Sequence, residues 1–435
     1  MKKRVAGLLA AVMLLSGCSL QKRERPQWEK PLEYTRPGGQ EAVVQSDAGA
    51  GPQAVAQRTI LYEGMLSDQL KYVIYVDGEM ELSGGNVTNK LLDESQLRGK
   101  WEKVETVTFG PGVEIIGREC ASDLNMKWVT LGADVRQIEE YAFASCTQLR
   151  SVEFNTGLRS IGSYAFSGCT QLRHADLGAG IESLGMQIFD NCATLKTVSL
   201  DCNPSARSFE GCTAVTQVEF GPNVTQIGEF AFKGCTGLTE LILPAGFQAI
   251  QSHAFEGCTS LSKVEFGEQI DSIGDYAFSG CSQLHSVTLG ESISFLGVRI
   301  FDNCTALNSI TLRCNPGTRS FEDCGSVTEV VFESGVSEIG SYAFKGCTSL
   351  QNLILPEGME IIRERAFEGC TSLSKIEIPK SLRLLEKYVF SGDMEIQEVV
   401  FCDRTFGQFQ PYGTAEWFDW CEGSSIREGI CHKKK

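Results

Sequence analysis

One column of phenylalanines constrains this chain more than any other feature of its sequence. Twelve of the 24 phenylalanines follow one another at intervals of 23 residues, shortened to 20 at two steps. A spacing this regular over most of a chain indicates stacked structural units, not a series of independent globular domains. The column consists of Phe143, Phe166, Phe189, Phe209, Phe232, Phe255, Phe278, Phe301, Phe321, Phe344, Phe367 and Phe390.

Each unit also contains a strand pattern, which the stretch 339–356 illustrates. Leu350, Leu353 and Leu355 form an L-x-x-L-x-L run, in which alternate residues face one side of a short strand. Along the chain this pattern predicts 14 strands. Their centres are Val107, Val129, Val152, Ala175, Val198, Val218, Leu241, Val264, Val287, Ile310, Val330, Leu353, Ile376 and Val399.

Eleven cysteines, Cys146 through Cys370, lie three residues after the column phenylalanines. The position before them holds residues that tolerate a positive φ, so we expect a left-handed turn residue there in nearly every unit. These residues are Ser145, Gly168, Asn191, Gly211, Gly234, Gly257, Gly280, Asn303, Asp323, Gly346, Gly369 and Gly392.

The cysteine column allows two interpretations, a metal or disulfide array and a ladder of buried thiols bonded to the backbone. We favour the buried ladder, because a free cysteine packs as a small apolar residue. The cysteines outside the column are the ones that an oxidising compartment would pair. A disulfide among Cys402, Cys421 and Cys431 is one alternative for the end of the chain, and the sequence leaves the connectivity open.

These motifs resemble the BspA-like leucine-rich-repeat proteins of bacterial surfaces, over a stretch from Val104 to Phe401. The resemblance implies an α/β repeat solenoid: a right-handed leucine-rich-repeat coil with one parallel β-sheet face, about 14 strand units and a cap at each end. It also implies a protein that binds other molecules, catalyses no reaction and needs no cofactor. Residues 59–103 are expected to form an N-terminal cap, with a hairpin turn at Asp77-Gly78, and 402–435 a C-terminal cap and tail.

The amino terminus has the composition of an export signal. A basic start and an apolar run over residues 1–17 precede Cys18 in the order Leu-Ser-Gly-Cys, which resembles a bacterial lipobox. That resemblance implies cleavage before Cys18 and attachment of lipid to its sulfur, as in proteins held on the outer side of a cell membrane or an outer membrane. The alternative is a free cysteine beside an ordinary cleavage site. Residues 18–58 are polar and rich in proline and glycine, which predicts a flexible tether.

A longer period lies over the repeat. The segments 201–204 and 313–316, Asp-Cys-Asn-Pro and Arg-Cys-Asn-Pro, are 112 residues apart, and each belongs to a shortened unit. Four units of 23 residues and one of 20 make 112, so a block of five units is duplicated. A ligand site built on this block would be present twice.

Composition and motifs exclude several classes of function. The formal charge of −16 argues against a nucleic-acid partner. Neither G-x-S-x-G nor H-E-x-x-H occurs, and the chain has only four histidines, so the sequence predicts no enzyme and no metal site. Aromatic residues in the tail would either cover the end of the coil or stack on a carbohydrate, and we favour the cover.

We therefore expect recognition of a protein or a glycoconjugate through the sheet face. The residue after each strand centre should point outward, and most of these residues are polar. The exceptions are the candidate ligand-binding residues, Ile242, Val331, Ile354 and Val400. Their alternative explanation is the ordinary preference of β-branched residues for strands. The competing function is an envelope spacer without a ligand, in which outward positions would only be polar.

Overall fold

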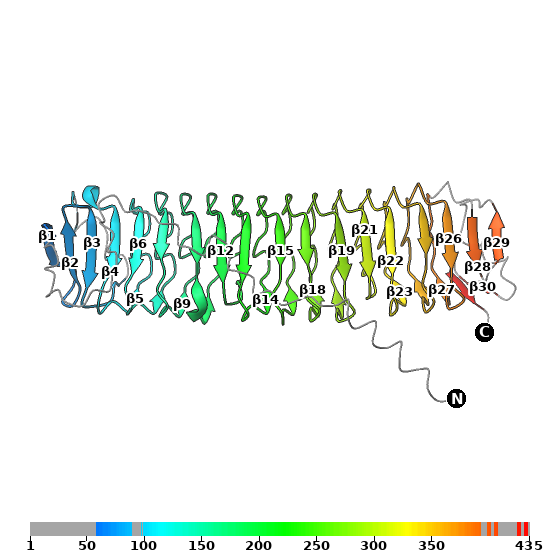
Figure 1. Ribbon diagram of the computed structural model, residues 1–435, viewed down its shortest axis with the longest axis horizontal. Coiled ribbons are helices and arrows are strands. Elements are labelled where there is room, and N and C mark those ends of the chain that lie inside the picture. Colours follow the sequence, from blue (N-terminus) through cyan, green and yellow to red (C-terminus); the bar gives the residue numbers. More distant parts are fainter. Residues whose placement is uncertain are drawn as a thin grey trace, which may run out of the picture. The chain divides into compact units, whose positions relative to one another are not determined.

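The computed structural model describes residues 58–88, 97 and 99–392, and the backbone of four strands after them. In this part the chain is a β-solenoid with parallel sheets, so the predicted leucine-rich-repeat coil is confirmed (Figure 1). Its connecting segments are turns. The helices described in full are two short 3-10 helices, η2 (Trp101–Lys103) and η3 (Gly178–Gly180).

All of the predicted strand centres lie in one row of longer strands. The row is divided into several hydrogen-bonded sheets, and within each sheet its neighbouring strands pair in parallel; for example, Val198 is opposite Val218. The row consists of β4 (Thr106–Phe109), β6 (Trp128–Leu131), β8 (Ser151–Glu153), β10 (His174–Asp176), β12 (Thr197–Leu200), β13 (Gln217–Phe220), β15 (Glu240–Ile242), β17 (Lys263–Glu265), β19 (Ser286–Leu289), β21 (Ser309–Leu312), β22 (Glu329–Phe332), β24 (Asn352–Ile354), β26 (Lys375–Ile378) and β28 (Glu398–Phe401).

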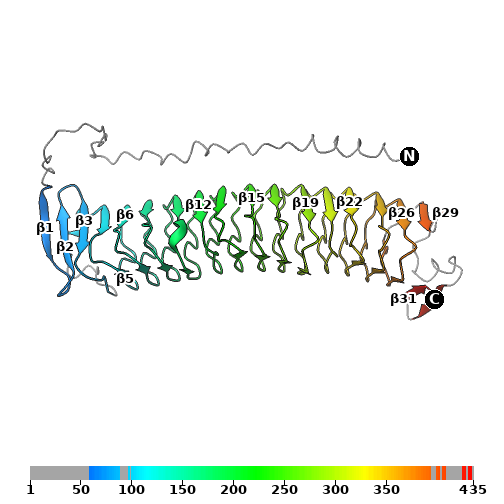
Figure 2. The same ribbon diagram turned by 60° about the horizontal axis from the view of Figure 1, so that its bottom comes forward.

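A second row of parallel strands, which the sequence analysis did not predict, runs along another side of the coil (Figure 2). Each strand has only two residues, and its second residue is apolar. The row consists of β5 (Ile115–Ile116), β7 (Gln137–Ile138), β9 (Ser160–Ile161), β11 (Ser183–Leu184), β14 (Gln226–Ile227), β16 (Ala249–Ile250), β18 (Ser272–Ile273), β20 (Phe295–Leu296), β23 (Glu338–Ile339), β25 (Ile361–Ile362) and β27 (Leu384–Leu385).

Antiparallel strands stand at both ends of the rows. β1 (Ile60–Met65) pairs with β2 (Lys71–Tyr75), β2 pairs with β3 (Glu79–Ser83) across the turn at Asp77-Gly78, and β3 pairs in parallel with β4. At the other end β29 (Arg404–Gly407) pairs with β28, and β31 (Ile430–Lys433) joins β27 to β30 (Ser424–Arg427). Antiparallel strands of this kind close an end that a repeat unit would leave open.

The column phenylalanines form a continuous stack in the core. Consecutive rings from Phe143 to Phe390 lie 5.0–5.8 Å apart, centroid to centroid, and nearly parallel. The column cysteines form the ladder of buried thiols that we favoured. Each is buried and in no disulfide, and its Sγ donates to a backbone carbonyl of the preceding unit; Cys258 Sγ lies 3.2 Å from Phe232 O. The core therefore repeats the same ring and thiol contacts from unit to unit.

The left-handed residue predicted before each cysteine is present in all twelve units, with φ between 57° and 87°. A second left-handed column lies two residues before each phenylalanine, and no glycine occupies it. Its φ values lie between 53° and 60°. It consists of Tyr141, Tyr164, Gln187, Arg207, Phe230, His253, Tyr276, Arg299, Arg319, Tyr342, Arg365 and Tyr388. We call this second column the outer stack, because its side chains stack on one another.

In each shortened unit an asparagine replaces a strand of the second row, which is interrupted between β11 and β14 and between β20 and β23. Asn203 Oδ1 accepts hydrogen bonds from the N–H groups of Thr225 and Gln226, at 2.8 and 3.0 Å. Asn315 Oδ1 accepts the same two bonds from Ser337 and Glu338, at 2.8 and 3.0 Å. In a regular unit a backbone carbonyl accepts both bonds, so the side-chain amide takes the place of a peptide group.

Candidate functional site

The outward face of the long row is the sheet surface that the sequence predicts as a ligand site. The residue after each strand centre does face solvent, and in most described strands it is polar. Among the apolar exceptions the exposed fractions are 50% for Ile242, 38% for Val331 and 59% for Ile354. Single exposed aliphatic residues are common on protein surfaces, so the exposure of these residues is informative only where it recurs in equivalent surroundings.

Ile242 and Ile354 occupy equivalent positions of the duplicated block, since they are 112 residues apart. Ile242 is opposite Glu265 on the next strand, and Ile354 is opposite Glu377. Both surroundings also contain a lysine on that next strand. Lys263 Nζ lies 3.0 Å from Glu240 and also pairs with Glu265, and Lys375 Nζ lies 2.8 Å from Glu377.

Each of these isoleucines therefore projects beside a lysine–glutamate pair, and the arrangement occurs twice. We call the two copies the isoleucine sites. They are separated by five strand-to-strand steps of about 4.8 Å each, so they are roughly 24 Å apart along the row. Each site lies on the strand that begins a new hydrogen-bonded sheet, since the ladder is interrupted between β13 and β15 and between β22 and β24.

The remaining predicted residues are placed less closely together. Val331 lies on β22, which is next to β24, but the interrupted ladder means that Val331 and Ile354 are not a hydrogen-bonded ladder pair. Val400 is opposite Glu377 in the backbone pairing of β26 and β28, and its side chain lies outside the described residues. Cys18, Cys402 and Cys421 lie outside them as well, as does the side chain of Cys431.

The outer stack is a feature that sequence reasoning missed. Phe230, His253 and Tyr276 stack with ring centroids 4.6 and 4.9 Å apart, and the guanidinium of Arg207 lies 4.2 Å from the centroid of Phe230. Arg319 lies in the same way 4.3 Å from the ring centroid of Tyr342. Planar side chains in one column of the sequence were the signal that could have revealed it, since only planar groups stack at this separation.

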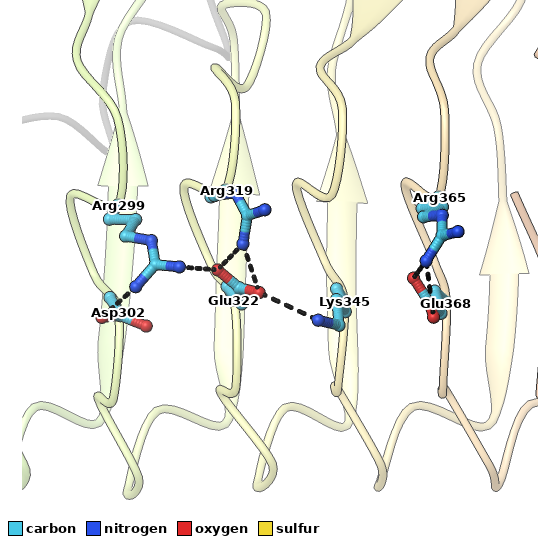
Figure 3. A network of polar contacts seen from close by, with 7 residues as sticks. All are labelled: Arg299, Asp302, Arg319, Glu322, Lys345, Arg365 and Glu368. Carbon is cyan, nitrogen blue, oxygen red and sulfur yellow. Dashed lines mark hydrogen bonds and ion pairs between the residues drawn. The ribbon is translucent and has the colours of Figure 1, made fainter.

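Beside the outer stack lies a network of charges around Glu322 (Figure 3). The Glu322 side chain is only 4% exposed and receives ion pairs from Arg319 at 2.8 Å, Arg299 at 3.2 Å and Lys345 at 3.3 Å, one from each of three consecutive units. Burial alone would raise the pKa of this carboxyl, but the hydrogen bonds from Arg319 and Lys345 outweigh it and hold the pKa below its usual value. Glu322 is thus an ionised group that ties neighbouring units together.

The network is a weak candidate for ligand binding, because its groups already satisfy one another. The first copy of the block repeats only part of it: Arg207 pairs with Glu210 at 2.7 Å, whereas Lys233 pairs with Glu256 of the next unit at 3.0 Å and Gln187 stands in the place of Arg299. Within the outer stack both faces of His253 are covered by neighbouring rings, which leaves no face there for a sugar to stack on. We interpret both features as structural.

The described residues offer little catalytic chemistry. They contain no group of three or more His, Cys, Asp or Glu side chains arranged to hold a metal ion. Burial raises the pKa of the ladder thiols, to about 12 for Cys258, so these sulfurs are poor nucleophiles near neutral pH. None of the helices in the described part has the length and hydrophobicity that a membrane span requires.

Comparison with protein-family models gives the family. The model described as "BspA type Leucine rich repeat region (6 copies)" matches residues 100–206, 204–318 and 315–409. The chain belongs to this family. Leucine-rich-repeat proteins are typically binding scaffolds without catalysis, and the comparisons indicate no enzyme family. A comparison with curated proteins found no match.

Solved structures of leucine-rich-repeat proteins resemble this BspA-type chain. A leucine-rich repeat protein from Bacteroides ovatus is 24% identical with a TM-score of 0.55, and the similarity covers 77% of this chain and 93% of that one. A leucine rich cell surface protein from Faecalibacterium prausnitzii is 21% identical over 78% of this chain and 95% of that one, with a TM-score of 0.40. The T. pallidum Leucine Rich Repeat protein is 29% identical over 41% of this chain and 81% of that one, with a TM-score of 0.34. The first of these similarities supports the fold alone.

Proposed function

We propose that this protein is a lipid-anchored extracytoplasmic recognition or adhesion protein, which binds a protein or glycoconjugate through the outward face of its long strand row and catalyses no reaction. The observation that carries the proposal is the repeated exposure of an isoleucine beside a lysine–glutamate pair, at Ile242 and at Ile354. An apolar side chain at the centre of a polar surface is the usual composition of a binding hot spot.

A paired substitution tests the sheet face. The Cys18→Ala chain is used to capture a binding partner, and the purified partner is then titrated against two variants that change both isoleucine sites, Ile242→Lys/Ile354→Lys and Ile242→Lys/Val331→Glu/Ile354→Lys. We expect each variant to weaken binding at least tenfold, because hot-spot residues each contribute about 2 kcal/mol or more. Thr288→Lys is the matched control, since Thr288 is an exposed outward residue of the same row away from both isoleucines.

Two results would count against the sheet face. If both variants keep their secondary structure by circular dichroism and bind as tightly as the original chain, the ligand lies elsewhere. If no partner is captured by the original chain at all, the spacer function becomes the better explanation.

The anchor needs a separate experiment at Cys18. We expect the original chain to enter the detergent phase in a detergent partition and the Cys18→Ala chain to stay in the aqueous phase, because a dually acylated cysteine anchors stably. Metabolic labelling with a fatty-acid analogue should mark only the original chain. Recovery of Cys18→Ala in the detergent phase would contradict lipid attachment at this residue.

A further inference from the structure

In the part of the chain that the structure describes, no strand pairs with one edge of β1. β1 is the terminal strand of its six-stranded sheet, in which β2 covers the other edge. Five of the twelve large apolar side chains that are exposed in the described residues gather on or beside β1. They are Ile60, Leu61, Tyr62, Met65 and Val76. An open strand edge with exposed apolar residues is a template for pairing with another strand.

We propose that two copies of this chain associate through their β1 strands, which pair antiparallel about a twofold axis. The axis stands perpendicular to the sheet, so the long strand rows of the two copies continue into each other. Tyr62 is opposite the buried Ile74 on β2 and therefore lies on the inward face. The inward faces of both copies would then share one side, as the alternation of side chains requires.

Charge selects the register of this pairing. Glu63 is the only charged residue of β1, and Lys71 of the same chain lies 3.0 Å from it. A pairing centred on Glu63 would place two carboxylates directly opposite each other, which is destabilising. A pairing centred on Tyr62 places Ile60 opposite Gly64 and Leu61 opposite Glu63, and it uses five residues of each strand. This is the longest pairing within β1 that avoids like charges.

Mass measurement tests the association. The Cys18→Ala chain is followed by light scattering over a concentration series, and we expect the mass to double at micromolar concentration. Leu61→Glu should restore the monomer, because in the proposed register the new carboxylate would lie directly opposite Glu63 of the other copy. Thr288→Glu, which adds the same charge on the exposed sheet face, should leave the dimer intact and controls for charge.

Cross-linking tests the register, again with Cys18→Ala in every chain. In the proposed pairing two Tyr62 positions face each other with Cα atoms about 4.5–5.5 Å apart, within the range of a disulfide. Mild oxidation should therefore convert most of the Tyr62→Cys chain to a covalent dimer. Leu61→Cys should react at least tenfold more slowly, because its two copies lie on a diagonal about 7–8 Å long and Glu63 still selects the register.

Three outcomes would overturn the proposal. The first is a monomer at every concentration, including the case in which a dimer appears only after residues 1–57 are removed, since those residues would then cover β1. The second is a dimer that survives Leu61→Glu. The third is equal cross-linking of Tyr62→Cys and Leu61→Cys.

Discussion

Replacing Asn203 by alanine should destabilise the fold locally, at the one place where its side chain accepts backbone hydrogen bonds. Its side-chain oxygen accepts two backbone hydrogen bonds, from Thr225 and Gln226, at a point where the second row has no strand. Alanine offers no acceptor there, and a hydrogen bond of this kind contributes about 0.5–1.5 kcal/mol. The two bonds together are therefore expected to contribute about 1–3 kcal/mol to local stability. Water can reach the exposed Gln226 more easily than the half-buried Thr225, which favours the lower half of that range.

Amide hydrogen exchange resolved to single residues is the suitable assay, because a solenoid opens locally before it unfolds. We expect the protection of the Thr225 and Gln226 amides to fall about tenfold in Asn203→Ala, as 1.4 kcal/mol corresponds to a factor of ten. Asn203→Asp keeps the acceptor and should keep the protection. Asn315→Ala should reproduce the effect at Ser337 and Glu338.

A matched control is Asn223→Ala, which removes an exposed asparagine whose Nδ2 donates to Asp201 Oδ2 at 2.9 Å. Its exchange at Thr225 and Gln226 should equal that of the original chain. If Asn203→Ala also exchanges like the original chain at both amides, the side-chain oxygen does not replace the missing carbonyl and our account of the shortened unit is wrong.

Three further predictions concern the core and its charges. Because the folded pKa of Glu322 is lowered, its ionised form stabilises the fold above about pH 4.3 and this contribution is lost as the pH falls through the folded pKa. Glu322→Gln should therefore lower the melting temperature more at pH 7 than at pH 3; an equal effect at both would contradict it. Native protein should label Cys258 with a thiol reagent far more slowly than denatured protein, since a pKa of about 12 leaves about one thiolate in ten thousand at pH 8, and fast native labelling would refute burial. Phe344→Ala should cost about 3–5 kcal/mol in denaturant titration, because rings at 5.2 Å cover both of its faces, and a loss below about 1 kcal/mol would refute the stacking argument.

The sequence predicts the parts of this fold that recur in residue type. The phenylalanine column predicts the period, and the leucine pattern predicts the strand centres. The residue type before the cysteine position, most often glycine, predicts one left-handed turn. The second row of strands escapes prediction, because a strand of two residues such as Ile361–Ile362 is too short to show a period. The outer stack escapes for another reason: tyrosine and arginine seldom adopt a positive φ, and only the neighbouring units hold Tyr164 or Arg319 in it.

The candidate site is likewise predictable from the sequence only in part. Exposure of Ile242, Val331 and Ile354 follows from the alternation of side chains along a strand and is observed. Their environment does not follow from it, because the alternation does not show where the hydrogen-bonded ladder is interrupted, as it is between β22 and β24. The role of Asn203 was equally hidden, since a side chain that substitutes for a peptide carbonyl leaves no periodic trace.

The duplicated block allows the number of units in this protein to change without any new kind of contact between neighbouring units. Residues 112 positions apart have equivalent neighbours: Phe209 stacks on Phe232 at 5.0 Å, and Phe321 stacks on Phe344 at 5.2 Å. Recombination between two such positions would delete or add five units and join surfaces that already fit each other. The same event would change the number of isoleucine sites by one, so the gene can vary the reach and the valency of its product in a single step.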